Sequence, residues 1–345
     1  MTAKTVRFGV IGCGVIAYWT HLPLLMRLKN VTLVAATDPN PESREKASRL
    51  THVPIYENAG ELLERDDIDA VVICAPSHLH AELAIAAAKA RKHFYLEKPI
   101  ASTVPDGRRV IDAVKDAGVS AAIGFNRRFH PAFEQARALV AAGRIGRVRA
   151  IVTVCSEPVP ISVTQEWRGQ RRTGGGVLLD LASHHVDLVR WVLGCEPTEI
   201  EGRIKSDVSE EDSAWLRLTM ADGSEVSGFF SFRAGLTEYL EFIGELGTVR
   251  VDRHRFSLSL RLTRRVGYGS RSAIVFPSPG MFAARMIRVR RPSYDPSYGR
   301  ALAAFVEMLN GGPSRVATLH DGLRSLETVA AAEHSVRAAL SPALS

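Results

Sequence analysis

The sequence predicts an α/β protein, in which a doubly wound parallel sheet forms the first domain and an α+β domain with a mostly antiparallel sheet follows. Short apolar runs alternate with helical segments up to residue 124, the pattern of strands joined by crossover helices. A glycine turn, Gly12-Cys13-Gly14, follows the first apolar run. From residue 148 onward, segments of alternating polar and apolar residues are typical of strands with one buried face.

The elements of the first domain follow from its apolar runs and the turn residues between them. We expect strands over residues 6–11, 31–37, 70–74, 93–96 and 120–124. We expect helices over residues 16–28, 41–50, 81–90 and 105–117. Strands and helices in this order predict a parallel sheet, so the first domain is placed at residues 1–124.

The second domain, at residues 125–345, begins with a helix and continues with alternating strands. We expect helices over residues 131–142, within 174–194, over 300–309 and over 319–340. We expect strands over residues 148–156, 200–205, 214–220, 225–232 and 239–244.

Composition limits the kind of protein. The 345 residues are 46% hydrophobic and 23% charged, which indicates a globular chain long enough for two cores. The start has no signal-cleavage pattern and the apolar stretches are short, so we expect a cytoplasmic protein without membrane contact. The four cysteines lie far apart with no C-x-x-C pair, which favours reduced thiols and no structural metal.

The net charge of +7 is concentrated in residues 253–294, which contain ten arginines and no acidic residue. Such a segment suits an anionic substrate such as a phosphate-bearing or nucleotide-linked sugar, an acidic partner, or nucleic acid. It also suits a solvated surface or a subunit contact. We prefer this last interpretation and expect no nucleic-acid partner, because no nucleic-acid-binding motif accompanies the segment.

A dinucleotide-binding pattern stands between the first strand and the first helix. Gly12-x-Gly14-x-x-Ala17, with Val15 and Ile16 between, permits a tight turn and lets the backbone approach a pyrophosphate. The alternative is a glycine turn that only packs a strand on a helix. The position after the strand and before the helix favours a Rossmann cofactor site.

Asp38 follows the second strand, where the fingerprint needs an acid to accept hydrogen bonds from the adenosine ribose. Its charge would repel a 2′-phosphate, so NAD is expected as cofactor and NADP is less favoured. Arg44, six residues on, keeps NADP open. The alternative role for Asp38 is that of a turn residue before Pro39.

Glu97-Lys98-Pro99 ends a strand at the edge of the parallel sheet where ligands of such folds bind. The Lys98 ammonium can hydrogen-bond a reacting hydroxyl and stabilise negative charge on its oxygen, while Glu97 adjusts the lysine's position or charge. A surface ion pair at a strand end explains the motif equally well.

A glycine-rich entry at residues 174–176 leads into a helix that carries two carboxylates and two histidines. Asp180, His184 and Asp187 share one face, while His185 points about 100° away. A neutral imidazole can take a proton from an alcohol, and a carboxylate can orient it or hold a substrate hydroxyl. The alternative is a buried helix with a satisfied histidine, and a metal would need a third ligand.

Three further groups are candidates for the site: Pro76 and His80, then Asn126, Arg127 and Arg128, and finally Trp167 and Arg168. The first group leaves a parallel strand, so it lies near the nicotinamide or caps a helix. The second grips a polyol or anion, or bonds to backbone where the domains join. The third packs on a sugar face, or the tryptophan belongs to a core.

The chain resembles the Gfo/Idh/MocA family, named for glucose-fructose oxidoreductase, inositol dehydrogenase and a rhizopine-catabolism protein. The resemblance covers roughly residues 5–250. It rests on five motifs in this order: Gly12-Cys13-Gly14-Val15-Ile16-Ala17, Ala75-Pro76-Ser77-x-x-His80, Glu97-Lys98-Pro99, Asn126-Arg127-Arg128-Phe129-x-Pro131 and Asp180-x-x-x-His184-x-x-Asp187.

The resemblance implies a Rossmann domain joined to a domain with a large open sheet, whose exposed face pairs subunits into dimers or tetramers. It implies that Lys98, Asp180 and His184 surround the reacting carbon. The expected reaction is reversible oxidation of a secondary alcohol of a sugar, cyclitol or nucleotide-sugar derivative, with hydride passing to NAD. In it, His184 takes the hydroxyl proton, Lys98 polarises the oxygen, and Asp180 orients His184 or the substrate.

Two other functions stay open from the sequence. One is cleavage of a glycosidic bond through transient oxidation by tightly held NAD, without net redox change. The other is a non-catalytic, NAD(H)-sensing regulator that uses the basic segment to bind an acidic partner.

Overall fold

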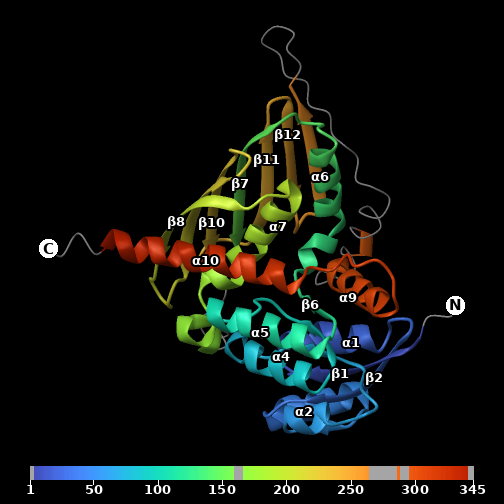
Figure 1. Ribbon diagram of the computed structural model, residues 1–345. Coiled ribbons are helices and arrows are strands. Elements are labelled where there is room, and N and C mark those ends of the chain that lie inside the picture. The colour runs from blue at the N-terminus through green and yellow to red at the C-terminus, as the bar shows by residue number, and fades with distance from the viewer. Residues whose placement is uncertain (1–3, 159–165, 264–285, 288–294, 341–345) are drawn as a thin grey trace. The chain divides into compact units, whose positions relative to one another are not determined.

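The computed structural model describes residues 4–158, 166–263, 286–287 and 295–340 (Figure 1). The chain divides into two compact units. The first consists of Met1–Asn126, Arg172–Gly174 and Tyr298–Leu326, and the second of Arg127–Arg171, Gly175–Ser297 and Glu327–Ser345. The first break thus falls two residues beyond the boundary that the sequence predicts, and two later segments join the first unit.

The first unit contains a six-stranded, entirely parallel sheet in the order β3-β2-β1-β4-β5-β6. Its strands are β1 (Val6–Ile11), β2 (Val31–Thr37), β3 (Ile55–Tyr56), β4 (Ala70–Ile73), β5 (His93–Leu96) and β6 (Ala121–Ile123). The predicted doubly wound sheet is confirmed. The strand order reverses between β1 and β4, and ligands of such sheets bind at the carboxyl ends of the strands beside this reversal.

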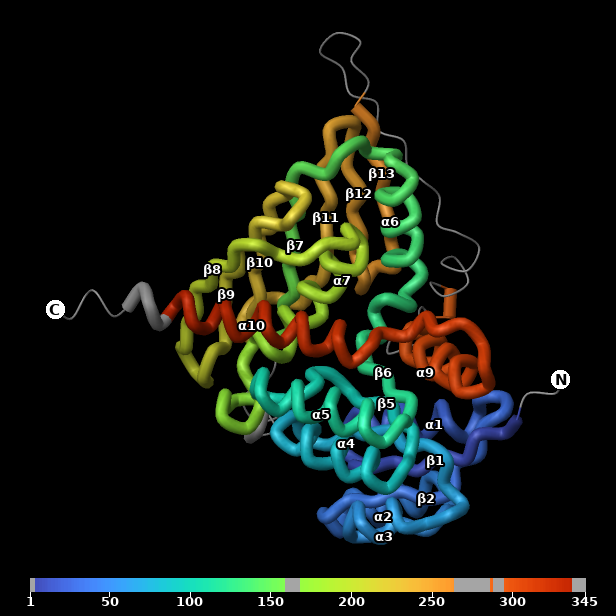
Figure 2. Tube along the Cα trace, in the orientation of Figure 1, coloured from blue at the N-terminus to red at the C-terminus, as the bar shows by residue number. Residues whose placement is uncertain are grey.

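The helices of the first unit are α1 (Leu22–Leu25), α2 (Pro41–Thr51), α3 (Ala59–Leu63), α4 (His80–Lys89), α5 (Val104–Ala117) and most of α9 (Pro296–Leu309). Figure 2 traces their order along the chain. The helical stretch predicted over residues 16–28 is confirmed up to residue 25, but its first part is a π-helical turn, Ala17–His21, which precedes a short α1. Such π turns are rare and often occur at functional sites.

Local signals explain where two of these helices begin and end. The Asn40 side chain accepts a hydrogen bond from the Ser43 amide (3.0 Å) at the start of α2, and Thr103 does the same for Asp106 (3.3 Å) at α5. Helix α5 ends at Gly118, whose φ of 64° suits glycine.

Aromatic packing explains why α9, expected in the second domain, belongs to the first unit. The Phe305 ring lies 6.3 Å from Phe8 of β1 and 5.9 Å from Tyr95 of β5. All three residues are buried. Helix α9 therefore completes the hydrophobic core of the parallel sheet. The periodicity of the sequence does not predict a contact between residues so far apart in the chain.

The second unit contains a seven-stranded sheet in the order β13-β12-β11-β7-β10-β9-β8. Its strands are β7 (Val148–Ser156), β8 (Pro197–Lys205), β9 (Ser213–Met220), β10 (Glu225–Ser231), β11 (Thr237–Gly244), β12 (Gly247–Asp252) and β13 (Ser257–Leu262). Pairings are antiparallel except between β7 and β10, so the mostly antiparallel sheet is confirmed. Strands β12 and β13 were not predicted.

Helices α6 (Pro131–Ala141) and α7 (Ser183–Leu193) cover one face of this sheet, as Figure 1 shows. A second π-helical turn, Leu178–Ala182, leads directly into α7. Helix α10 (Leu319–Leu340) begins in the first unit and ends in the second. No helix in the described part of the chain is both long and apolar enough to cross a bilayer.

The other face of the sheet is partly exposed. Trp215, whose exposed fraction is 41%, packs on Phe229 with ring centroids 5.3 Å apart. Most of the predicted arginine-rich segment, namely residues 264–285 and 288–294, lies outside the described residues. The subunit pairing implied by the resemblance stays a prediction.

Candidate active site

The glycine turn after β1 lies directly against the chain that leaves β4. Gly12 has a φ of +92°, and a Cβ there would lie 2.9 Å from the carbonyl atoms of Cys74, so only glycine fits. A Cβ on Gly14 would meet nothing within 4 Å. The turn is therefore packed on one side and open on the other, as close approach of a pyrophosphate requires.

Asp38 is tied to this turn. Its Oδ2 accepts a hydrogen bond from the Cys13 amide (2.7 Å), and its Oδ1 accepts one from Asn40 (2.8 Å). Arg44 donates to the carbonyl oxygens of Asp38 (3.0 Å) and Pro39 (2.8 Å). The carboxylate thus stands beside the glycine turn as an acceptor, which suits ribose hydroxyls and disfavours a phosphate.

Glu97 follows β5 and points into the protein. The residue is 8% exposed, and its Oε1 lies 2.7 Å from Nε2 of His21 in the first π-helical turn. Lys98, the next residue, is half-buried and precedes a cis peptide bond to Pro99. Because the Glu97 carboxylate is buried, the alternative interpretation of the motif as a surface ion pair is wrong. His21 was not predicted as the partner of Glu97.

His80, predicted as a cofactor contact or helix cap, is 1% exposed at the start of α4. Its Nδ1 lies 2.6 Å from the Pro99 carbonyl oxygen and its Nε2 lies 2.9 Å from that of Ala75. Burial lowers the pKa of His80, and the two carbonyl oxygens partly oppose this effect. Pro76 precedes the 3-10 turn Ser77–Leu79.

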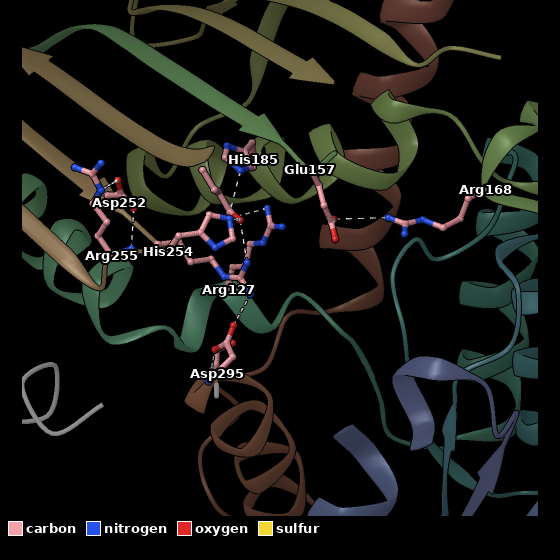
Figure 3. A network of polar contacts seen from close by, with 11 residues as sticks. Arg127, Glu157, Arg168, His185, Asp252, His254, Arg255 and Asp295 are labelled. Atoms are coloured by element: carbon pink, nitrogen blue, oxygen red, sulfur yellow. Dashed lines mark hydrogen bonds and ion pairs between the residues drawn. The ribbon is translucent and has the colours of Figure 1, made fainter. Parts of the chain in front are cut away.

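Asp180 lies in the second π-helical turn, and its Oδ2 accepts a hydrogen bond from Nε of Arg168 (2.9 Å). The same guanidinium lies 3.8 Å from Glu157, a contact drawn in Figure 3, and above the Phe232 ring. The charge of Asp180 raises the pKa of Arg168. His184, in the first turn of α7, is 7% exposed.

Asp187 and two further candidates take part in buried ion pairs. Arg128 donates through Nε to Asp187 Oδ2 (2.8 Å) and through Nη2 to Oδ1 (2.5 Å), a two-pronged contact. Nη1 of Arg127 lies 3.1 Å from Glu238 Oε1. Asn126 is also buried. Substrate contact by these residues and by Trp167, whose side chain is not described, stays a prediction.

A charged network inside the second unit centres on Glu238 of β11, and Figure 3 labels its members Arg127, His185 and His254. Nη1 of Arg253 lies 2.9 Å from its Oε2, and Nε2 of His254 lies 3.9 Å from the same atom. Nε2 of His185 lies 3.6 Å from Oε1. Burial opposes ionisation of Glu238, but the charges of Arg127 and Arg253 outweigh it and hold its pKa well below the usual value. The centre of the network is therefore a buried carboxylate with two arginine counter-charges.

Ligand-type atoms of Cys155, His185 and Glu238 lie within 4.8 Å of one another inside this network. Burial raises the pKa of the Cys155 thiol to about 12 and lowers that of His185 to about 4. The thiol therefore keeps its proton. Because two guanidiniums already balance the carboxylate, the cluster is explained without a metal.

Sequence reasoning missed Glu238 and Arg253, although one signal was present. Glu238 is in phase with Leu240 and Phe242 on the inward face of β11, so a charged residue occupies a core position of the alternation. No such signal marks His21, whose partner Glu97 lies 76 residues away.

Comparison with known proteins agrees with this geometry. Residues 6–125 match the GFO/IDH/MocA oxidoreductase family with an NAD-binding Rossmann fold, and residues 133–250 match the GFO/IDH/MocA C-terminal domain. Myo-inositol 2-dehydrogenase of Thermotoga maritima is 28% identical over 340 residues, covering 96% of each chain. Inositol 2-dehydrogenase of Rhizobium meliloti is 28% identical over 341 residues, covering 96% of this chain and 97% of the relative.

Solved structures show the same fold. The WlbA dehydrogenase of Bordetella pertussis, in complex with NADH and UDP-GlcNAcA, has a TM-score of 0.84 at 24% identity and covers 98% of this chain and 97% of its own. A putative myo-inositol dehydrogenase of Sinorhizobium meliloti has a TM-score of 0.78 at 27% identity, covering 97% and 98%. The chain therefore belongs to the Gfo/Idh/MocA family and is an oxidoreductase with an NAD-binding Rossmann domain.

Proposed function

We propose that the protein catalyses the reversible, NAD-dependent oxidation of a secondary alcohol on a sugar, cyclitol or sugar derivative. The observation that carries the proposal is the position of Lys98, two residues after the end of a parallel strand of the NAD-binding unit. Relatives named as inositol dehydrogenases match nearly the whole chain. The intact Lys98, Asp180 and His184 favour an active enzyme over a cofactor-sensing regulator.

The chemistry requires a hydride acceptor and a proton acceptor. Bound NAD supplies the hydride acceptor, and the alcohol carbon becomes a carbonyl carbon when it loses its hydride. His184 accepts the hydroxyl proton, since an imidazole ordinarily titrates near pH 6.5. The Lys98 ammonium stabilises negative charge on the oxygen as the proton leaves.

Asp180 serves as an acceptor that holds a substrate hydroxyl or orients His184. The support for this role is its hydrogen bond from Arg168, which remains a cation at all physiological pH values. A carboxylate paired with a permanent cation keeps its charge, so it is a poor proton acceptor for an alcohol. The proton therefore goes to His184.

The test follows absorbance of reduced nicotinamide while inositols, free sugars, sugar acids and nucleotide sugars are offered with NAD or NADP. We expect oxidation of at least one polyol with NAD. Lys98→Met and His184→Ala should lower kcat by roughly 10²–10⁴-fold. Lys89→Met and His320→Ala, which change exposed residues, are matched controls and should not.

Three outcomes would contradict the proposal. Glycoside cleavage without net accumulation of NADH would identify the transient-redox hydrolase. Wild-type turnover by Lys98→Met would exclude Lys98 from stabilising the oxygen, and wild-type turnover by His184→Ala would exclude His184 as the proton acceptor. Activity confined to NADP would remove the role of Asp38.

A further inference from the structure

Two buried histidines of the first unit contact the residues on either side of Lys98. His21 is 0% exposed, and its Nε2 lies 2.7 Å from the carboxylate of Glu97. His80 is 1% exposed, and its Nδ1 lies 2.6 Å from the carbonyl oxygen of Pro99. The residue before Lys98 is thus held by its side chain and the residue after it by its backbone.

The Glu97 carboxylate has little freedom to leave His21. A Cβ on Gly124 would lie 2.9 Å from Glu97 Oε2, so there is no room for a side chain between Gly124 and the carboxylate. The His21 ring in turn packs against Tyr95 and Tyr298, with centroids 5.9 and 6.1 Å away. Close packing around Glu97 and around the His21 ring therefore restricts the movement of the pair.

Both histidines also connect the Lys98 segment to the nucleotide turn. His21 is the last residue of the π-helical turn that begins at Ala17, the final residue of the glycine motif. Nε2 of His80 lies 2.9 Å from the carbonyl oxygen of Ala75, while Nδ1 faces that of Pro99, and Gly12 packs against the backbone of Cys74 and Ala75. Two separate chains of contacts therefore join the turn to the segment.

We propose that His21 and His80 are positioning residues that hold the Lys98 backbone at a fixed place relative to the nucleotide turn. The inference rests on the proposed function, because in that function the Lys98 ammonium must contact the reacting oxygen of the substrate. A catalytic side chain must be held within about 0.5 Å of its productive position. A displacement of about 1 Å costs on the order of 10²-fold in rate.

The experiment compares two kinds of substitution at each histidine. One kind removes the contact, and the other keeps a side-chain N–H that can donate a hydrogen bond. His21→Leu removes the group that faces Glu97, His21→Asn is too short to reach it, and His21→Gln retains an amide N–H near the position of Nε2. At the second histidine, His80→Leu removes the contact with the Pro99 carbonyl oxygen, and His80→Gln keeps an amide N–H. His93→Leu is the control, because His93 lies at the other end of β5 and accepts a hydrogen bond from the Ser120 amide (2.9 Å).

The first readout is steady-state kinetics with the best alcohol substrate. We expect His21→Leu and His80→Leu to lower kcat by about 10–100-fold with little change in KM, because an interaction with the transition state is lost. His21→Gln should recover most of kcat. His93→Leu should lower the melting temperature without this change in kcat.

The second readout needs no turnover. Lysines are reductively methylated with a ¹³C label, and the Lys98 resonance is assigned by its loss in Lys98→Arg. In the wild type the chemical shift of this resonance should differ from that of exposed lysines, because Lys98 is half-buried. His21→Leu, His21→Asn and His80→Leu should move it toward the exposed values, while His21→Gln and His93→Leu leave it in place.

The outcomes separate the two proposals. If the wild type oxidises no alcohol, the proposed function fails, and the Lys98 resonance still decides whether the histidines position the lysine. If His21 and His80 variants lose only thermal stability, with kcat and the Lys98 resonance unchanged, their role is structural and the inference is overturned. If the leucine variants do not fold, His21→Asn against His21→Gln decides.

Discussion

Each unit has a buried carboxylate on a strand or at its end, and these two carboxylates, Glu97 and Glu238, face different kinds of partner. Glu97 of the first unit, 8% exposed, faces a single histidine. Glu238 of the second unit, 2% exposed, faces Arg127 and Arg253. Arginine is always charged, whereas the charge of a histidine depends on pH and surroundings.

The difference follows the chemistry expected near each carboxylate. A permanent pair of cations makes Glu238 a stable structural centre, but the same pair beside Lys98 would repel a cationic ammonium that must approach a substrate. A histidine can hold Glu97 through one hydrogen bond without adding a fixed charge. Under the proposed positioning role, Glu97 is held by a hydrogen-bonding partner, whereas Glu238 is held by two permanent cations.

The largest expected effect comes from removing the Glu238 charge. Glu238→Gln leaves Arg127 and Arg253 buried without their shared counter-charge, so the free energy of unfolding should fall by about 3–5 kcal/mol. Urea denaturation measures this value. Glu241→Gln, on the same strand with Arg250 3.5 Å away at the surface, should cost about 0–1 kcal/mol. Equal losses for the two variants would mean that the buried network does not stabilise the second unit more than a surface pair does.

Much of the fold could be predicted from the spacing of apolar residues along the chain and from the turn residues between the elements. Strand β7 and helix α10 have the predicted bounds, because each has a long, regular apolar pattern. Strand β3 and helix α3 have two and five residues, too few to show a period. The parallel pairing of β7 with β10 depends on distant contacts and leaves no local signal.

The candidate site was predictable in its motifs but not in its partners. Lys98 and Asp180 stand in recognisable segments, because turn geometry and helix spacing are local properties. The partners of those segments, His21 and Arg168, come from elsewhere in the chain and were either missed or given another role. Burial decides such pairs, and burial depends on the whole fold.

The second effect concerns the pH dependence of the second unit. Burial holds the folded-state pKa of His185 at about 4, below its ordinary value of about 6.5. Between these values the unfolded chain binds more protons, so stability is complete above about pH 6.5 and falls by roughly 3 kcal/mol as pH drops to 4.

Urea denaturation at several pH values tests this expectation. His185→Gln should flatten the profile between pH 6.5 and 4, while the fall below pH 4 remains. That lower fall comes from Glu238 and from Asp295, whose pKa is about 2 because the charge of Arg253 outweighs its burial. An unchanged slope above pH 4 in His185→Gln would assign the acid sensitivity to other groups.

The smallest expected effect comes from a substitution that tests how tightly the protein packs around the Glu97 carboxylate. Gly124→Ala would place a Cβ 2.9 Å from Glu97 Oε2 and 3.1 Å from its Cα, so we expect a loss of about 1–3 kcal/mol from overpacking. Gly60→Ala in α3, where a Cβ meets nothing within 4 Å, should instead stabilise by up to about 1 kcal/mol. Thermal and urea unfolding measure both. A neutral Gly124→Ala would show that the Glu97 carboxylate can move, and the first unit would then hold its strand end less rigidly than the distances to His21 indicate.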